Sequence, residues 1–300
     1  MVSENGKNSL ILLLMSIIWG FAFAAQRLGA GALGPFSFFA FRNYFAVIAM
    51  IVFFILFRDR KANTDLKLTI RYGLIGGLME FVASASQQAG IAYTSTANSS
   101  FITATYVIMV PVLSLFTGRK TSGKTWFCVL LEVIGLYLLC IKESCAINIG
   151  DVLTMICALF FAIHIILIDK GGEKLDSIVF CLVQFIVCAI LSTLMMFIFE
   201  YPVNVEGVRT ALVPLLYTGV LSSALCVTLQ VKVQKETDPT IASLIMCLES
   251  VFGALGGWLI LNETLNAKEL FGCLIVFVAI VISQLPDGKH ELKIFSRFVK

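Results

Sequence analysis

Ten continuous apolar runs, most of them about twenty residues long, divide the 300-residue chain. A transmembrane helix needs about 20 consecutive apolar residues to cross a hydrocarbon core about 30 Å thick. The links between the runs are short, which leaves no room for a separate soluble domain. The sequence therefore predicts an all-α membrane protein with ten transmembrane helices, at roughly 9–27, 35–57, 70–89, 96–117, 124–141, 149–168, 176–199, 209–231, 240–261 and 267–285.

Composition supports this class of protein, since 59% of the residues are hydrophobic and 14% are charged. Soluble domains are about 45–50% apolar and about 25% charged. A transmembrane β-barrel would alternate polar and apolar residues, whereas these runs are continuous. Eight of the nine cysteines lie within the runs and are expected to act as small apolar fillers. Cys145 lies in a link between two runs. A disulfide bond between Cys145 and Cys140 at the outer surface is the alternative to free thiols.

The distribution of positive charge predicts the orientation. If the N-terminus is cytoplasmic, seventeen of the 22 Lys and Arg residues lie on the cytoplasmic side and four on the outer side, as the positive-inside rule requires. Both termini are then cytoplasmic, and a basic tail at 287–300 lies at the membrane surface. A cleavable leader ending near Ala22-Phe23-Ala24 is an alternative. It would leave nine helices.

The two halves of the chain resemble one another. A shift of 144 residues superimposes six identical pairs in two helix pairs, and small gaps bring Gln87 onto Gln230 and Arg42 onto Gln184. Each half contains five predicted helices, an odd number, so the halves would lie in opposite orientations in the membrane. Inverted repeats of this kind are typical of secondary transporters, with a site at the midplane between the repeats. We expect one repeat at 9–142 and the other at 148–286.

One carboxylate, Glu249, stands near the middle of the apolar stretch 239–265. It lies about 15 Å along the helix, close to the bilayer midplane. An acid at that depth almost always faces a bundle interior or a wet cavity. Small residues share its helix face and should allow another helix to pack closely, namely Ala242, Gly253, Gly256 and Gly257.

Two longer stretches carry a family resemblance. SASQQAGIAYTSTANSSFITATYVIMVPVLS (84–114) and TLQVKVQKETDPTIASLIMCLESVFGALGGWLILNETL (228–265) resemble the drug/metabolite transporter superfamily, EamA type. The elements E-S-V-F (249–252) and L-N-E-T-L (261–265) are similar to the second-repeat pattern of that family. The resemblance covers nearly the whole chain as two EamA repeats. It implies ten helices, cytoplasmic termini, a central cavity and alternating access, and many such proteins are thought to export amino acids or other small metabolites.

The chain also departs from the family pattern. Arg119 stands where many first repeats have an acid like Glu263. Ser250 replaces a common proline, so the resemblance no longer predicts a kink in the helix at 240–261. Pro111, in contrast, is expected to kink the helix at 96–117.

Polar side chains within the apolar runs are the candidate binding residues. Each has a structural alternative, such as interhelical hydrogen bonding or core packing. Arg42 needs a partner, for which Glu80 and Glu249 are the candidates, and it could bind a substrate carboxylate or form half of an ion pair. Glu132 is expected to serve helix packing or an oligomer contact. The candidate cavity residues are Arg42, Glu80, Gln87, Thr103, Tyr106, His164, Gln184, Gln230, Glu249 and Trp19.

These features favour a secondary-active transporter in the plasma membrane, with protons or cations as the candidate coupling ions. The family resemblance implies export of amino acids or similar small metabolites. No cofactor, metal or nucleic acid is expected. A lipid-modifying enzyme is one alternative, and His164 with Asp169 matches the spacing of an acyltransferase motif. On a helix, however, these two side chains would point about 140° apart. A scaffold or receptor is the other alternative, although a scaffold has no use for acids at the midplane.

Overall fold

The computed structural model describes residues 4–59, 63–118, 121–140 and 148–285. Every predicted apolar segment is helical within these limits. The first half contains α1 (Glu4–Ala30), α2 (Pro35–Phe57), α3 (Leu66–Gly90), α4 (Thr96–Ala104), α5 (Tyr106–Phe116) and α6 (Gly123–Cys140). The second half contains α7 (Ile149–Gly171), η1 (Gly172–Lys174), α8 (Ser177–Phe199), α9 (Val205–Thr210), α10 (Leu212–Leu216), η2 (Tyr217–Val227), α11 (Thr228–Gln234), α12 (Pro239–Met246), α13 (Glu249–Leu261) and α14 (Ala267–Gln284). The basic tail and the predicted Cys140–Cys145 bridge lie outside the described side chains.

Eight helical segments of the described chain are long and apolar enough to cross a membrane. Four of them are composite, because α4 continues into α5, α7 into η1, α10 into η2 and α11, and α12 into α13. The other two predicted segments are α3 and α6. Each is helical, and each carries charge, Arg71 and Glu80 on α3 and Lys124 and Glu132 on α6. The ten-span arrangement and its orientation therefore stay predictions.

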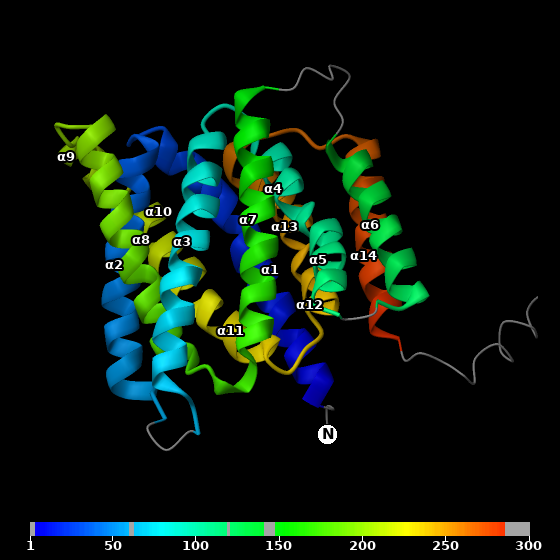
Figure 1. Cartoon of the computed structure of the whole chain (residues 1–300). Coiled ribbons are helices and arrows are strands. Elements are labelled where there is room, and N and C mark those ends of the chain that lie inside the picture. Colours follow the sequence, from blue (N-terminus) through cyan, green and yellow to red (C-terminus); the bar gives the residue numbers. More distant parts are fainter. Residues whose placement is uncertain (1–3, 60–62, 119–120, 141–147, 286–300) are drawn as a thin grey trace, which may run out of the picture.

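Helices from the two halves pack against one another in pairs (Figure 1). α2 packs along α8 at one edge of the bundle, and α6 packs along α14 at the opposite edge. Between these edges, α3 packs on α7, and α1 packs on α13. Most of the close packing therefore joins residues far apart in sequence, and the two halves form one bundle.

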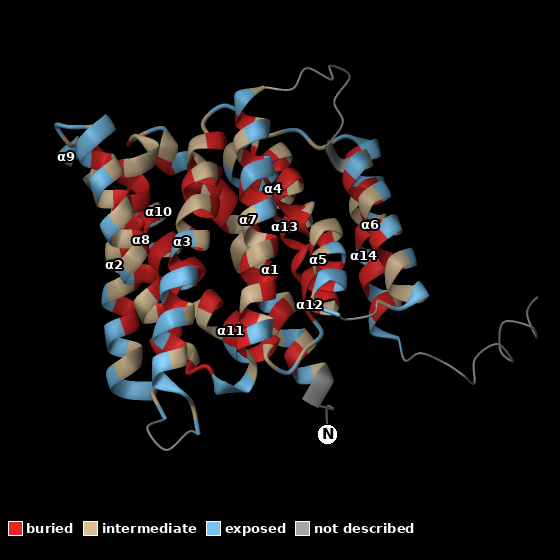
Figure 2. Cartoon of the chain, viewed as in Figure 1, coloured by how far each residue is buried: buried red, intermediate tan, exposed pale blue. Residues whose placement is uncertain are grey.

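Burial follows this arrangement (Figure 2). Buried side chains line the inward helix faces, and many large apolar side chains are exposed on the outward faces, such as Ile55 on α2, Phe197 on α8 and Phe277 on α14. Exposed apolar patches of this extent are rare on soluble monomers. They are the surface that a bilayer would cover.

Two of the composite helices are interrupted near their middle. α4 and α5 are separated at Thr105, and α12 and α13 are separated at Cys247 and Leu248. At both sites a backbone hydrogen bond spans three residues instead of the usual four. Thr105 N donates to Ile102 O and Leu248 N donates to Ile245 O, both at 3.2 Å. A shift of 144 residues places the two interruptions within two residues of one another.

The positions of the two interruptions do not follow from proline residues. Pro111 was expected to kink its helix, but it lies within α5, six residues beyond the interruption. The second interruption occurs although Ser250 replaces proline. A hydroxyl group bonds to a backbone carbonyl beside each site, since Thr105 Oγ1 donates to Ile102 O at 2.6 Å and Ser250 Oγ donates to Cys247 O at 2.8 Å. Such bonds compete with the helical ladder and bend helices.

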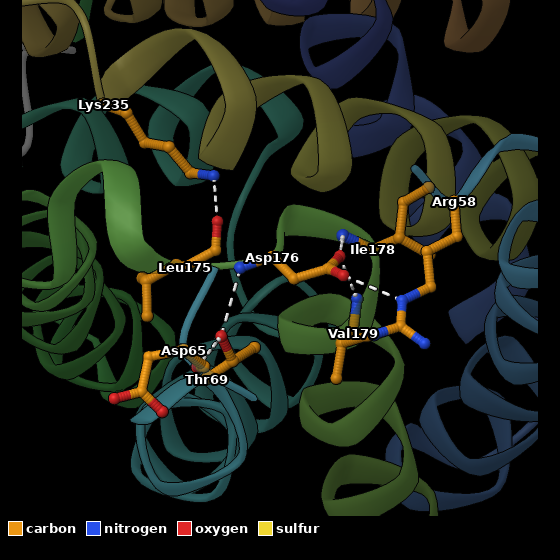
Figure 3. Close-up of polar contacts among 8 residues, drawn as sticks. All are labelled: Arg58, Asp65, Thr69, Leu175, Asp176, Ile178, Val179 and Lys235. Atoms are coloured by element: carbon orange, nitrogen blue, oxygen red, sulfur yellow. Dashed lines mark hydrogen bonds and ion pairs between the residues drawn. The ribbon is translucent and has the colours of Figure 1, made fainter. Parts of the chain in front are cut away.

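One end of the bundle is held by a network around Asp176 (Figure 3). The Asp176 carboxylate caps α8 and accepts from Arg58 Nε at 2.8 Å, at the end of α2. Its backbone N–H donates to Thr69 Oγ1 on α3 at 3.1 Å. Lys235, after α11, donates to the carbonyl of Leu175. Burial lowers the pKa of Lys235, and the nearby Asp176 carboxylate opposes that shift.

The other end of the α2–α8 pair is also joined by a carboxylate. Glu200, at the end of α8, accepts from the backbone N–H groups of Phe36 and Ser37 at 2.9 and 2.7 Å. These groups belong to the first turn of α2, where backbone donors lack helical partners. The antiparallel pair of α2 and α8 is thus joined at one end by Asp176, which directly precedes α8, and at the other end by Glu200, which directly follows it.

Candidate functional site

A central cavity of about 60 Å³ lies between the two halves. Its walls include residues of α1, α2, α3, α5, α7, η2, α11, α12 and α13. Since one water molecule needs about 10–15 Å³ by this kind of measure, the cavity has room for several waters. Eight of the ten candidates from the sequence line it, namely Trp19, Arg42, Glu80, Gln87, Tyr106, His164, Gln230 and Glu249. Thr103 and Gln184 lie behind this wall.

Arg42 is 6% exposed, and its Nε donates to Ser223 Oγ at 2.9 Å. Within the described chain its Nη1 has no hydrogen-bond partner, and it forms no ion pair within 4 Å. The expected pairing with Glu80 or Glu249 is therefore absent from this conformation. Glu80 lies near enough to Arg42 to interact electrostatically, but its Oε1 accepts from Ser84 Oγ at 2.7 Å, one turn along α3.

The glutamines are tied to the cavity wall by hydrogen bonds. Gln87 donates through Nε2 to Thr103 Oγ1 at 3.1 Å, which places Thr103 as a support for Gln87. Gln230 donates through Nε2 to Gln234 Oε1 at 3.1 Å, and Gln234 in turn donates to the carbonyl of Ile165 at 2.7 Å. The two residues that the sequence comparison aligned, Gln87 and Gln230, thus line the same cavity from opposite halves.

His164 combines the two roles that its sequence position left open. It lines the cavity and is 2% exposed, and its Nε2 lies 2.7 Å from Gln184 Oε1. One hydrogen bond thus joins the His164 ring to the Gln184 amide. Gln184 therefore does not line the cavity itself but holds the His164 ring in the cavity wall.

Glu249 is the first residue of α13, directly after the interruption, and is 5% exposed. Its carboxyl faces the Tyr106 hydroxyl at the start of α5, and its Oε1 has no hydrogen-bond partner in the described chain. The predicted close packing of its helix is confirmed, since a Cβ at Gly253 would lie 2.6 Å from Ser100 of α4. The two helix interruptions thus place Tyr106 and Glu249 together at the cavity.

Several wall features have no strong sequence signal. The segment η2 is π-helical, a form that often occurs at functional sites. It places the Ser222 carbonyl 2.9 Å from Trp19 Nε1 and presents Ser223 to Arg42. Gln26 also lines the cavity, and its Oε1 has no partner in the part of the chain that the structure describes. Gln26 was missed because it lies at the end of the predicted helix, where a polar residue is ordinary.

The described residues contain no group of three or more His, Cys, Asp or Glu side chains that could hold a metal. The helix α7 runs without interruption through His164 and Asp169, so these two side chains do not share a face of the helix.

Comparisons with known proteins agree over nearly the whole chain. The model of the EamA-like transporter family matches residues 7–141 and again residues 148–284. An uncharacterized transporter of Archaeoglobus fulgidus is 29% identical over 280 residues, which cover 91% of this chain and 84% of that protein. The uncharacterized transporter YoaV of Bacillus subtilis is 24% identical over 289 residues, which cover 94% and 98% of the two chains.

A solved crystal structure has the same fold. It superimposes with a TM-score of 0.76 at 14% sequence identity, over 93% of this chain and 98% of the other. At that identity the likeness concerns the arrangement of the helices alone.

Proposed function

Because the chain belongs to the EamA-like transporter family and is a multi-pass protein of the plasma membrane, we propose that it is a secondary-active exporter of amino acids or similar small metabolites. The solute binds in the central cavity, and the two repeats move relative to one another so that the cavity opens to each side in turn. Protons or cations couple to this movement.

One observation carries the choice of solute. Arg42 and Glu249 line the same cavity, and one polar atom of each, Nη1 and Oε1, has no hydrogen-bond partner in the described structure. Buried polar groups without partners are costly. A zwitterion would satisfy both atoms, with its carboxylate on Arg42 and its ammonium on Glu249. Since the cavity has room for only several waters, the walls must separate slightly for such a solute to enter.

The moving walls are the helix pairs of the two halves that contain the interruptions, α3 with α4 and α5, and η2 and α11 with α12 and α13. The packing of the outer helices supports this assignment. α2 packs on its counterpart α8 and α6 packs on its counterpart α14, so these pairs join the two halves at the edges and the interrupted helices lie between them. At one end, the network of Arg58, Thr69, Asp176 and Lys235 must open when the solute passes that way (Figure 3).

The experiment measures uptake of labelled amino acids into proteoliposomes, driven by an imposed proton or cation gradient. The wild-type protein should bind one class of amino acid, seen first as a rise in melting temperature during a screen of amino acids, nucleosides and amines. Glu249→Gln should reduce coupled flux to the level of empty liposomes while leaving expression and monodispersity intact.

The matched control is Glu206→Gln, the same change at an exposed carboxylate on α9. This variant should transport as the wild-type protein does. Unchanged flux in Glu249→Gln would reject the role of that carboxylate, and binding of nucleosides or amines alone would reject the zwitterion.

A further inference from the structure

A second buried carboxyl, Glu132 on α6, lies outside the cavity wall. It is 0% exposed, and neither of its carboxyl oxygens has a hydrogen-bond partner in the described structure. Its helix neighbours Cys128 and Leu136 belong to the largest apolar cluster, together with Val276 and Ile280 of α14. Burial of this extent within one chain excludes the oligomer contact that the sequence had left open for Glu132.

The surroundings of Glu132 connect it to the two helix interruptions. Its carboxyl lies close to the Cys247 thiol, which stands between α12 and α13. That thiol points to the carbonyl of Ala104, the last residue of α4, at 3.9 Å. Glu132 thus contacts the site where both broken helices meet, and Glu249 lies two residues beyond Cys247 on the cavity side.

The groups that face Glu132 offer no positive charge. They are Cys128 on its own helix, Cys247 on the interrupted helix and Tyr106 on α5, with Glu249 on the far side of Cys247 and Tyr106. Lys124, two turns before Glu132 on α6, acts on Cys128 and donates to the Leu285 carbonyl. The titratable residues of α14 are confined to its first two turns and are Lys268, Glu269 and Cys273. Close packing keeps water out, since a Cβ at Gly135 would lie 2.8 Å from the Gly272 carbonyl. An ionised carboxylate without a partner or water would be very costly in such a place.

We propose that Glu132 is a second proton-binding site, which holds a proton while the interruptions at Thr105 and Cys247–Leu248 are packed against α6 and releases it when they move away. On release, the O–H bond of the carboxylic acid breaks, and the proton passes to water that enters the opened site. The proposal rests on the proposed transport function for its role in a cycle. It deepens that function, because movement of the interrupted helices would be linked to a proton that never contacts the solute.

The test compares amide hydrogen exchange in wild type, Glu132→Gln and Glu132→Leu, each in lipid nanodiscs without solute, at several pH values. The reporters are the peptides that contain residues 104–108 and 246–250. At acidic pH all three proteins should exchange alike in these peptides. At alkaline pH, ionised Glu132 should expel the interruptions from their packed position, and wild type should exchange about tenfold faster than either variant. Peptides of α2 should show no such difference.

Infrared spectra of the same samples supply the second readout. At neutral pH the wild-type protein should show a protonated-carboxyl C=O band that is lost in Glu132→Gln, whereas Glu206→Gln should lose carboxylate signal instead. A pH-independent ratio of exchange rates, or loss of carboxylate signal in Glu132→Gln, would overturn the proposal. So would failure of both Glu132 variants to fold, since the carboxyl would then be structural. Neither readout needs transport, so a failed amino-acid assay would reject the proposed solute and leave this result standing.

Discussion

Single side chains decide the chemistry of the cavity, and most of them could be named from the sequence. Arg42, Glu80 and Glu249 are costly in hydrocarbon, so their positions in apolar runs already indicated a wet interior. Glu80 and Glu249, the partners named for Arg42, form no ion pair with it in the described structure. Arg42 bonds to Ser223 because the π-helical turn of η2 presents that hydroxyl, and nothing in the local sequence distinguishes η2 from an ordinary helix.

The Arg42–Ser223 contact predicts two variants with opposite behaviour. Arg42→Met should be monodisperse, with a melting temperature equal to that of the wild-type protein or higher, because a buried charge is replaced by an apolar side chain. Its transport should be lost. Ser223→Ala should lower the free energy of unfolding by about 1–3 kcal/mol, because it leaves the guanidinium without its partner.

A double-mutant cycle separates these effects. In the Arg42→Met background, Ser223→Ala should cost little, so the two changes should not add. Equal losses of stability in both backgrounds, measured by thermal unfolding in detergent, would mean that the 2.9 Å contact contributes nothing.

At the scale of the helices, apolar runs predicted every segment, but they did not predict where helices break. The sequence placed a kink at Pro111 and offered no reason for one at Ser250. The breaks instead follow hydroxyl-to-carbonyl bonds and packing between α4, α5, α12 and α13. These depend on contacts between distant parts of the chain, so no local pattern reports them.

The break before α13 predicts how the helix tolerates proline. Ser250 is in the first turn of α13, and its N–H donates to Cys247 O at 3.0 Å, outside the i→i−4 ladder. Ser250→Pro should therefore lower the free energy of unfolding by about 1 kcal/mol, the loss of one hydrogen bond at a position where a fixed φ is tolerated. Ala254→Pro, one turn further inside α13, should cost about 3 kcal/mol or more. Equal losses in melting temperature for the two variants would contradict an interruption at Cys247–Leu248.

At the scale of the molecule, the sequence predicted one bundle made from two similar halves, and the family model matches each half separately. The sequence of either half alone could not predict that α2 packs on α8 or that α6 packs on α14. The residues on a helix face indicate that the face is buried, but they do not identify the helix that covers it. The cavity exists because those pairs stand at opposite edges and leave α1, α3 and α7 with the broken helices between them (Figure 1).

The solute must pass through this cavity if the proposed function is right. The reactivity of a single cysteine placed in the cavity wall tests that route most directly. Ala22 lines the cavity, whereas Ala46 is equally buried in an apolar cluster of α2, α8, η2 and α11 and is not among the residues that line the cavity. With the native cysteines replaced, Ala22→Cys in proteoliposomes should react with a membrane-impermeant maleimide applied to either side, and a transported amino acid should slow the reaction. Ala46→Cys should stay unreactive. Reaction of Ala22→Cys from one side only, or no effect of any amino acid that is transported, would contradict a cavity that opens to both sides in turn.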